Sequence, residues 1–121
     1  AGRVKKHKEK LLSILNKNKN KTIVGYGASA RSSTLLYYCG IGAKQILVIA
    51  DQNPLKQGFY TAGTHILIQS QDKVMKKNPN FVMILAWNFK DEIMKILKEK
   101  CNYKGKYIMP LPNKPKVLWK N

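Results

Sequence analysis

The segment GYGASA, from Gly25 to Ala30, constrains the fold of this chain more than any other feature. It follows a short β-branched, apolar stretch, residues 22–26, that predicts a strand. It precedes residues 31–38, whose pattern predicts a helix ended by Gly40 and Gly42. Because a strand that runs through a glycine turn into a helix is the first part of a βαβ unit, the sequence predicts an α/β fold.

Strands and helices alternate along the rest of the chain. Strands that are apolar on both faces and joined by helices require a parallel sheet covered on both sides, with right-handed crossovers. The predicted fold class is α/β, a Rossmann-like three-layer sandwich with a mainly parallel sheet of about five strands, preceded by an N-terminal amphipathic helix. The expected strands are residues 22–26, 45–50, 64–68, 81–86 and 106–109, and the expected helices are residues 3–17, 31–38, 70–77 and 90–100. Ser70 is the expected N-cap of the third helix, Asn78 and Pro79 stop it, and the proline-rich tail LPNKPK follows the last strand.

The length allows one domain with a core of its own, since 44% of the 121 residues are hydrophobic. Residues 1–20 are expected to form a lead-in helix and linker, and residues 21–121 the domain. No apolar run approaches the roughly 18–20 residues that span a bilayer. The N-terminus shows neither a starting Met nor an apolar signal core, so we expect no membrane contact, no export signal and a cytoplasmic setting.

The chain is strongly basic, with 23 Lys and Arg against 6 Asp and Glu and a formal net charge of +17. Polyanions bind such surfaces through counterion release, which makes nucleic acid a partner to consider. Arginine, which phosphate and guanine recognition favours, occurs only at Arg3 and Arg31. The composition therefore argues against nucleic acid and favours a solvated lysine surface that faces anionic substrates or an acidic partner domain.

The glycine turn predicts an anion pocket at the carboxyl end of the first strand. Gly25 is expected to permit the tight turn, and Gly27 to let the backbone approach an anion. Ala30 is expected to keep the helix close to the sheet, while free helix N–H groups face the ligand. Ser29 and Ser32 are either ligand donors or ordinary helix-start residues. The alternative for the whole segment is that the glycines serve only a strand-to-helix turn.

Charged residues near this turn complete a nucleotide-binding pattern. Asp51 ends the second predicted strand, about 20 residues beyond the turn, where Rossmann folds bind a ribose. Arg31 and Lys56 are candidate phosphate partners. If the glycines serve only the turn, Asp51 merely caps a loop.

For other polar and aromatic side chains, the sequence is compatible with either a binding role or a structural one. His65 is either a hydrogen-bonded structural residue or a general base. Trp87, Asn88 and Phe89 follow the fourth strand and either stack on or hydrogen-bond a ligand, or pack. Cys39 and Cys101 lie far apart, with no neighbouring His to complete a zinc set. We expect no metal site, no role for either cysteine and no catalytic residue in this chain.

Four segments in order resemble the C-terminal domain of a family of sugar C-methyltransferases. They are GYGASARSSTLLYYCGIG (residues 25–42), DQNPLKQGFYTAGTHILI (51–68), ILAWNFKDEI (84–93) and YIMPLP (107–112). The chain departs from the family pattern at Ser32 and Ser33, where Gly-Asn is expected, and at Ala62 and Leu67, where Pro is expected. These departures affect the expected substrate contacts more than the expected fold.

The resemblance implies a three-part enzyme of which this chain is the third part. A Cys-rich zinc-binding segment and a central domain that holds S-adenosylmethionine would precede it. The enzyme would methylate a carbon next to the keto group of a nucleotide-linked deoxysugar, and the chain alone would be inactive and hold no cofactor. Its implied role is to form part of the wall around the nucleotide sugar, most plausibly of the thymidine diphosphate type. The combined set of substrate-binding residues is Gly25, Gly27, Ala28, Ser29, Arg31, Asp51, Asn53, Lys56, Tyr60, His65 and Asn88.

Two other functions remain compatible with these residues. GYGASA and Asp51 also permit an autonomous domain that binds NAD or another nucleotide. The lysine excess permits a nucleic-acid module, which would bind with a steep dependence on salt.

Overall fold

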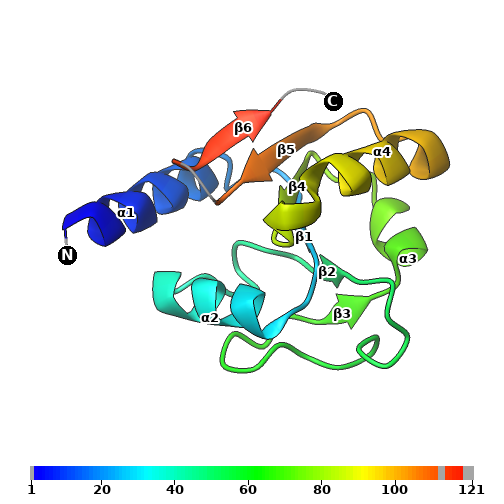
Figure 1. The fold of residues 1–121 in the computed structure, drawn as a ribbon, viewed down its shortest axis with the longest axis horizontal. Coiled ribbons are helices and arrows are strands. Elements are labelled where there is room, and N and C mark those ends of the chain that lie inside the picture. The colour runs from blue at the N-terminus through cyan, green and yellow to red at the C-terminus, as the bar shows by residue number, and fades with distance from the viewer. Residues whose placement is uncertain (1, 112–113, 119–121) are drawn as a thin grey trace.

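One six-stranded sheet forms the centre of the computed structural model, which describes residues 2–111 and 114–118 (Figure 1). The strand order across the sheet is β3-β2-β1-β4-β5-β6. Strands β1 to β5 run parallel, and β6 pairs antiparallel with β5. The strands are β1 (Ile23–Tyr26), β2 (Ile49–Ala50), β3 (Ile68–Gln69), β4 (Phe81–Ile84), β5 (Lys106–Met109) and β6 (Lys116–Leu118). The predicted mixed α/β class with a mainly parallel sheet is confirmed.

Helices cover both faces of this sheet (Figure 1). They are α1 (Gly2–Lys17), α2 (Ala30–Cys39), α3 (Gln71–Met75), α4 (Lys90–Cys101) and a 3-10 turn, η1 (Trp87–Phe89). The predicted N-terminal amphipathic helix is therefore present as α1. Within the described residues, no helix has the length and apolar character needed to cross a bilayer.

The core consists of two apolar clusters, one on each face of the sheet, because successive strand side chains point to opposite faces. In β1, Ile23 packs with α1 and α2, whereas Val24 packs with α3 and α4. Leu11 of α1 and Leu36 of α2 are fully buried in the first cluster, and Leu97 of α4 is fully buried in the second. Each helix is thus held by the apolar stripe that its sequence predicts.

Local signals set several element ends as predicted. Helix α2 ends at Gly40, and Ser70 caps α3 by accepting a hydrogen bond from the Lys73 amide. Helix α3 is shorter than predicted, ending at Met75 rather than near residue 77. Asn78 takes a left-handed conformation, with φ of 50°, directly before Pro79. In the turn before Asn78, backbone amides bond to the carbonyls three residues earlier, as in a 3-10 helix.

Strand number and strand length differ from the sequence prediction. The second and third strands are only two residues long, although the Leu47 amide already bonds to the Ile23 carbonyl before β2 begins. Strand β6 lies in the tail that the sequence predicted only as proline-rich, of which residues 112 and 113 lie outside the described residues. Strand β6 pairs with the edge of β5. This pairing depends on the arrangement of the whole sheet, so a local sequence pattern does not reveal it.

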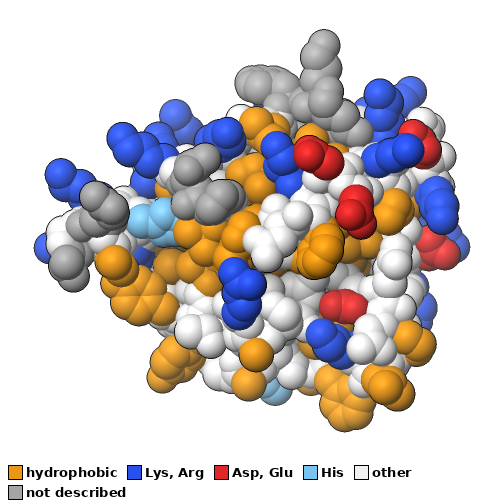
Figure 2. All heavy atoms as spheres, in the orientation of Figure 1, with side chains coloured by type: hydrophobic (Ala, Val, Ile, Leu, Met, Phe, Trp, Pro, Cys, Tyr) orange, Lys and Arg blue, Asp and Glu red, His pale blue; other side chains and the backbone are white. Residues whose placement is uncertain are grey.

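Positive charge dominates the surface. Figure 2 shows Lys and Arg side chains around most of the visible face, with Asp and Glu at only a few places. The one ion pair recorded among the described residues joins Lys90 and Asp91, which is 95% exposed and therefore contributes little to stability. Most lysines are consequently available to an external anion.

Gly27 allows the chain just after β1 to lie close to the chain just after β4. Its φ is 104°, a conformation that residues with a side chain rarely adopt. A Cβ at this position would lie 2.8 Å from the Ala86 Cβ and 3.1 Å from the Ala86 amide nitrogen. Both the backbone conformation and the space therefore require glycine here.

We expect Gly27→Ala to destabilise the fold more than Gly58→Ala does. Gly58 has a similar φ, 92°, but a Cβ there would meet nothing within 4 Å. Backbone strain alone should lower the free energy of unfolding by about 1 kcal/mol in Gly58→Ala. Backbone strain together with the clash at Ala86 should lower it by about 3 kcal/mol in Gly27→Ala. Urea unfolding measures both values, and equal losses would contradict a steric role for Gly27.

Candidate functional site

The strand-to-helix bend, residues 26–30, is held by a pair of serines. Ser29 is the N-cap of α2, and its Oγ accepts a hydrogen bond from the Ser32 amide at 3.1 Å. The Ser32 hydroxyl donates to the Gly27 carbonyl at 2.9 Å and is buried. The two serines, which the sequence left open between ligand donors and helix-start residues, therefore both stabilise the bend.

Two backbone amides at the start of α2 have no hydrogen-bond partner within the described part of the chain. They belong to Ala30 and Arg31, in the first turn after the N-cap. The first N–H groups of a helix lack intrahelical partners and carry partial positive charge. This end of α2 can therefore accept an anion from outside the chain.

Asp51, directly after β2, accepts a hydrogen bond from an amide two residues before Ala30. Its Oδ2 accepts a hydrogen bond from the Ala28 amide at 2.8 Å, and its Oδ1 accepts one from the Asn53 amide at 2.8 Å. Asp51 therefore contacts the glycine turn directly, through the hydrogen bond from the Ala28 amide. Because a carboxylate already lies at Ala28, an incoming anion would meet the open Ala30 and Arg31 amides further along the chain.

Lys56 also reaches the bend from the turn that follows β2. Its Nζ donates to the Ala28 carbonyl at 2.6 Å. The same turn is held by the Asn53 side chain, whose Oδ1 accepts from the Leu55 amide at 3.0 Å, and by Gln57, whose side chain donates to the Asp51 carbonyl at 2.8 Å. Lys56 therefore places a positive charge beside the bend, as the sequence predicted, and Asn53 has a structural hydrogen bond there.

A cavity of about 170 Å³ lies beside the first turn of α2, at the carboxyl ends of β1 and β4. The Arg31 guanidinium stacks over the Trp87 ring, with its central carbon 4.7 Å from the ring centre. Asn88 and Phe89 are exposed at the rim. The residues that line the cavity are Ser29, Arg31, Leu85, Ala86, Trp87, Asn88 and Phe89. The structure thus brings three predicted site residues, Ser29, Arg31 and Asn88, together.

Tyr60 and His65 do not line this cavity. Their rings stack on each other at 4.3 Å in the connection between β2 and β3, where Tyr60 bridges to Leu67. The His65 backbone is left-handed, with φ of 56°, and its amide donates to the Thr61 carbonyl at 3.0 Å. Both rings are exposed, so they form a separate aromatic pair on the surface.

Gly25 has a different role from the predicted one. It is the third residue of β1, not part of the turn, so the prediction that it permits the tight bend is wrong. A Cβ at this position would lie 2.9 Å from the Leu85 side chain and 3.1 Å from that of Ile49. Gly25 therefore allows side chains from both neighbouring strands to pack over β1.

A polar cluster on the other face of the same edge was not predicted. The Tyr26 hydroxyl donates to Gln71 Oε1, which also accepts from the Gln52 side chain at 3.0 Å. Burial raises the pKa of Tyr26 above its ordinary value, so the phenol stays protonated at neutral pH. The position of Tyr26 at the end of β1 was the only signal in the sequence. Among the described residues, no three His, Cys, Asp or Glu side chains come together as a metal site would need.

Comparison with known proteins agrees with this architecture. The chain belongs to the C-methyltransferase C-terminal domain family, whose model matches residues 1–112. A relative, C-methyltransferase NovU of Streptomyces niveus, is 38% identical over 98 residues, which are 81% of this chain and 23% of the relative. The chain therefore spans less than a quarter of that relative's length. The resemblance predicted from the sequence to a C-methyltransferase C-terminal domain is confirmed.

We expect Asp51→Ala to destabilise the fold by about 1–3 kcal/mol, because it leaves the Ala28 amide without its acceptor. Asp91→Ala is the matched control, since Asp91 is 95% exposed and its one ion pair recorded in the described part of the chain is with Lys90 at 3.7 Å. The Asp91→Ala variant should lose less than about 1 kcal/mol of its free energy of unfolding. Chemical unfolding compares the two, and an Asp51→Ala variant as stable as Asp91→Ala would show that the hydrogen bond to Ala28 does not support the bend.

Proposed function

We propose that this chain is the C-terminal domain of an S-adenosylmethionine-dependent C-methyltransferase that acts on a nucleotide-linked keto-deoxysugar, and that it forms part of the wall of the nucleotide-sugar site. The observation that carries the proposal is the cavity between α2 and η1, which Arg31, at the start of α2, and Asn88 both line. The domain would bind substrate without performing the methyl transfer.

The position of the cavity in the sheet supports this proposal. Strand β1 has β2 on one side and β4 on the other, and the chain crosses from β3 to β4 over the sheet. In open α/β sheets with a Rossmann-like strand order, ligands bind outside the carboxyl ends of the strands where the order reverses. The cavity between the ends of β1 and β4 lies at this point.

The chemistry of the donors fits a diphosphate. The Arg31 amide and guanidinium, on a residue that lines the cavity, are donors, and phosphate oxygens only accept. The Ala30 amide and the Lys56 ammonium, which donates to the Ala28 carbonyl, lie at the same bend but outside the lining. The contact with the Trp87 ring positions the Arg31 guanidinium at the cavity, and a guanidinium can contact a phosphoryl group through two donors at once. Asn88, at the rim, has both a donor and an acceptor for a sugar hydroxyl.

The size of the cavity indicates that a second surface completes the site. Small-molecule pockets usually enclose about 300–1,000 Å³, and this cavity has about 170 Å³. The methyl-donor cofactor, when bound, would supply an electrophilic methyl group, and the base that forms the substrate carbanion must lie near it. Within the described residues, no titratable side chain lines the cavity except Arg31, which does not serve as a base at neutral pH. Base and donor sites are therefore proposed for another domain of the full enzyme.

We expect the isolated chain to bind thymidine diphosphate or a thymidine diphosphate sugar weakly, with a dissociation constant of about 1 mM. Arg31→Ala should weaken binding about tenfold, because it removes a charge-assisted contact. Lys95→Ala, which removes an exposed charge from α4, should leave binding unchanged. Calorimetry with S-adenosylmethionine should give no heat of binding.

Three results would contradict the proposal. Micromolar binding of S-adenosylmethionine would place the donor site in this chain. Tight binding of NAD with no response to thymidine diphosphate sugars would favour an autonomous dinucleotide-binding domain. Shifts of a nucleic acid band at physiological salt, with a steep salt dependence, would favour a nucleic-acid module.

A further inference from the structure

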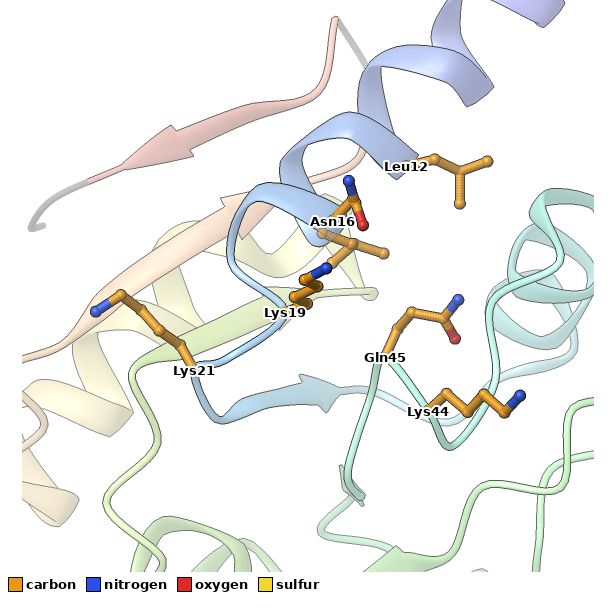
Figure 3. Close-up of a pocket in the computed structure, with 7 residues that line it drawn as sticks. Leu12, Asn16, Lys19, Lys21, Lys44 and Gln45 are labelled. Atoms are coloured by element: carbon orange, nitrogen blue, oxygen red, sulfur yellow. The ribbon is translucent and has the colours of Figure 1, made fainter.

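A second cavity lies at the opposite edge of the sheet, where β1 and β2 begin (Figure 3). It has a volume of about 380 Å³, within the usual range of about 300–1,000 Å³ for small-molecule pockets. The last turns of α1 and the segments that precede β1 and β2 enclose it. The lining residues are Leu12, Leu15, Asn16, Lys19, Lys21, Lys44 and Gln45.

Three lysines surround this cavity, on two separate segments of the chain. Lys21 and Lys44 lie on opposite sides of the opening, with Lys19 and Gln45 between them (Figure 3). All three lysine side chains are exposed. None of the six acidic residues of the chain lines the cavity, and no ion pair to these lysines is recorded among the described residues. The opening therefore has unbalanced positive charge.

Three carbonyls at the end of α1 already accept hydrogen bonds within the chain. The end of α1 exposes carbonyl groups, but Ile14 O accepts from the Asn18 side chain at 2.8 Å and Leu15 O accepts from the Asn18 amide at 3.2 Å. The Asn16 carbonyl accepts from the Lys19 amide at 3.3 Å. These bonds reduce the partial negative charge that a helix C-terminus would otherwise present to the cavity.

Gln45 contributes a further donor. Its Oε1 accepts a hydrogen bond from the Gly42 amide at 3.0 Å, which leaves the Nε2 group for the cavity. The cavity then has ammonium and amide donors, together with the Asn16 side-chain amide, above an apolar wall of Leu12 and Leu15. Such a set is suited to a ligand that only accepts hydrogen bonds and carries more than one negative charge.

The same basic edge continues into an adjoining hollow. Lys21 also lines a cavity of about 310 Å³, where Lys104 and Pro79 are among the other lining residues. A ligand with several linked anionic groups can contact lysines on more than one segment at once, whereas a single carboxylate cannot. This arrangement favours an elongated anion over a monovalent one.

We propose that the Lys19–Lys21–Lys44 cavity is a binding site for an oligophosphate anion, distinct from the nucleotide-sugar site. The two lie at opposite edges of the sheet, so the proposal does not depend on the proposed function. The Lys21 and Lys44 side chains extend outward from the opening in Figure 3, so binding turns them inward around the phosphoryl groups. Because the lysines are exposed to solvent, the affinity decreases as salt increases.

Backbone amide chemical shifts during titration with inorganic tripolyphosphate test this site. The expected result is saturable shifts at residues 16–21 and 43–46. Lys44→Glu and the double variant Lys19→Ala/Lys44→Ala each weaken binding about tenfold or more, since each removes charge-assisted contacts. These side chains are exposed and unpaired, so the variants should fold as the parent does.

Lys98→Ala is the matched control, because Lys98 is an exposed lysine on α4, which packs on the other face of the sheet. It should change the affinity less than twofold if the cavity is the site. A loss in Lys98→Ala as large as that in Lys44→Glu or in Lys19→Ala/Lys44→Ala would mean that tripolyphosphate binds the general lysine surface, and would overturn the proposal. Saturable shifts confined to residues 28–31 would overturn it as well, because the anion would then occupy only the opposite edge.

Discussion

Gly27 and Ala86 approach each other where β1 and β4 end, and the position of the candidate site depends on this contact. A Cβ at Gly27 would lie 2.8 Å from the Ala86 Cβ, so only glycine allows the two strand ends to come this close. The approach places the first turn of α2 beside η1, which in turn sets the Arg31 guanidinium over the Trp87 ring. The cavity at the carboxyl edge is the space between these two elements.

Asp51 and Lys56 determine which backbone groups of the bend at Gly27 are already hydrogen-bonded. The Asp51 carboxylate satisfies the Ala28 amide, and the Lys56 ammonium satisfies the Ala28 carbonyl. Both backbone polar groups of Ala28 are thus held by side chains from the connection between β2 and β3. The Ala30 and Arg31 amides, in the first turn of α2, have no partner recorded among the described residues.

The sequence predicts those parts of the structure that local chemistry decides. The strand at β4, the end of α2 at Gly40 and the Ser70 cap follow from patterns within a few residues. The bond from Ala28 to Asp51, the packing over Gly25 and the pairing of β6 with β5 join residues far apart in sequence. The same holds for the candidate site. The glycine turn is a local pattern and was predicted from the sequence. The separation of Tyr60 and His65 from the cavity depends on the path of the β2–β3 connection, which the sequence does not show.

Hydrogen exchange at single amides tests the central claim, that the bend is closed at Ala28 and open to an anion at Ala30 and Arg31. In the free chain, the Ala28 amide should exchange slowly, because it is bound to Asp51, and the Ala30 and Arg31 amides should exchange fast. Saturating thymidine diphosphate should slow the Ala30 and Arg31 amides and leave α4 unchanged. Fast exchange at Ala28 in the free chain, or no slowing at Ala30 and Arg31 with ligand bound, would contradict the account.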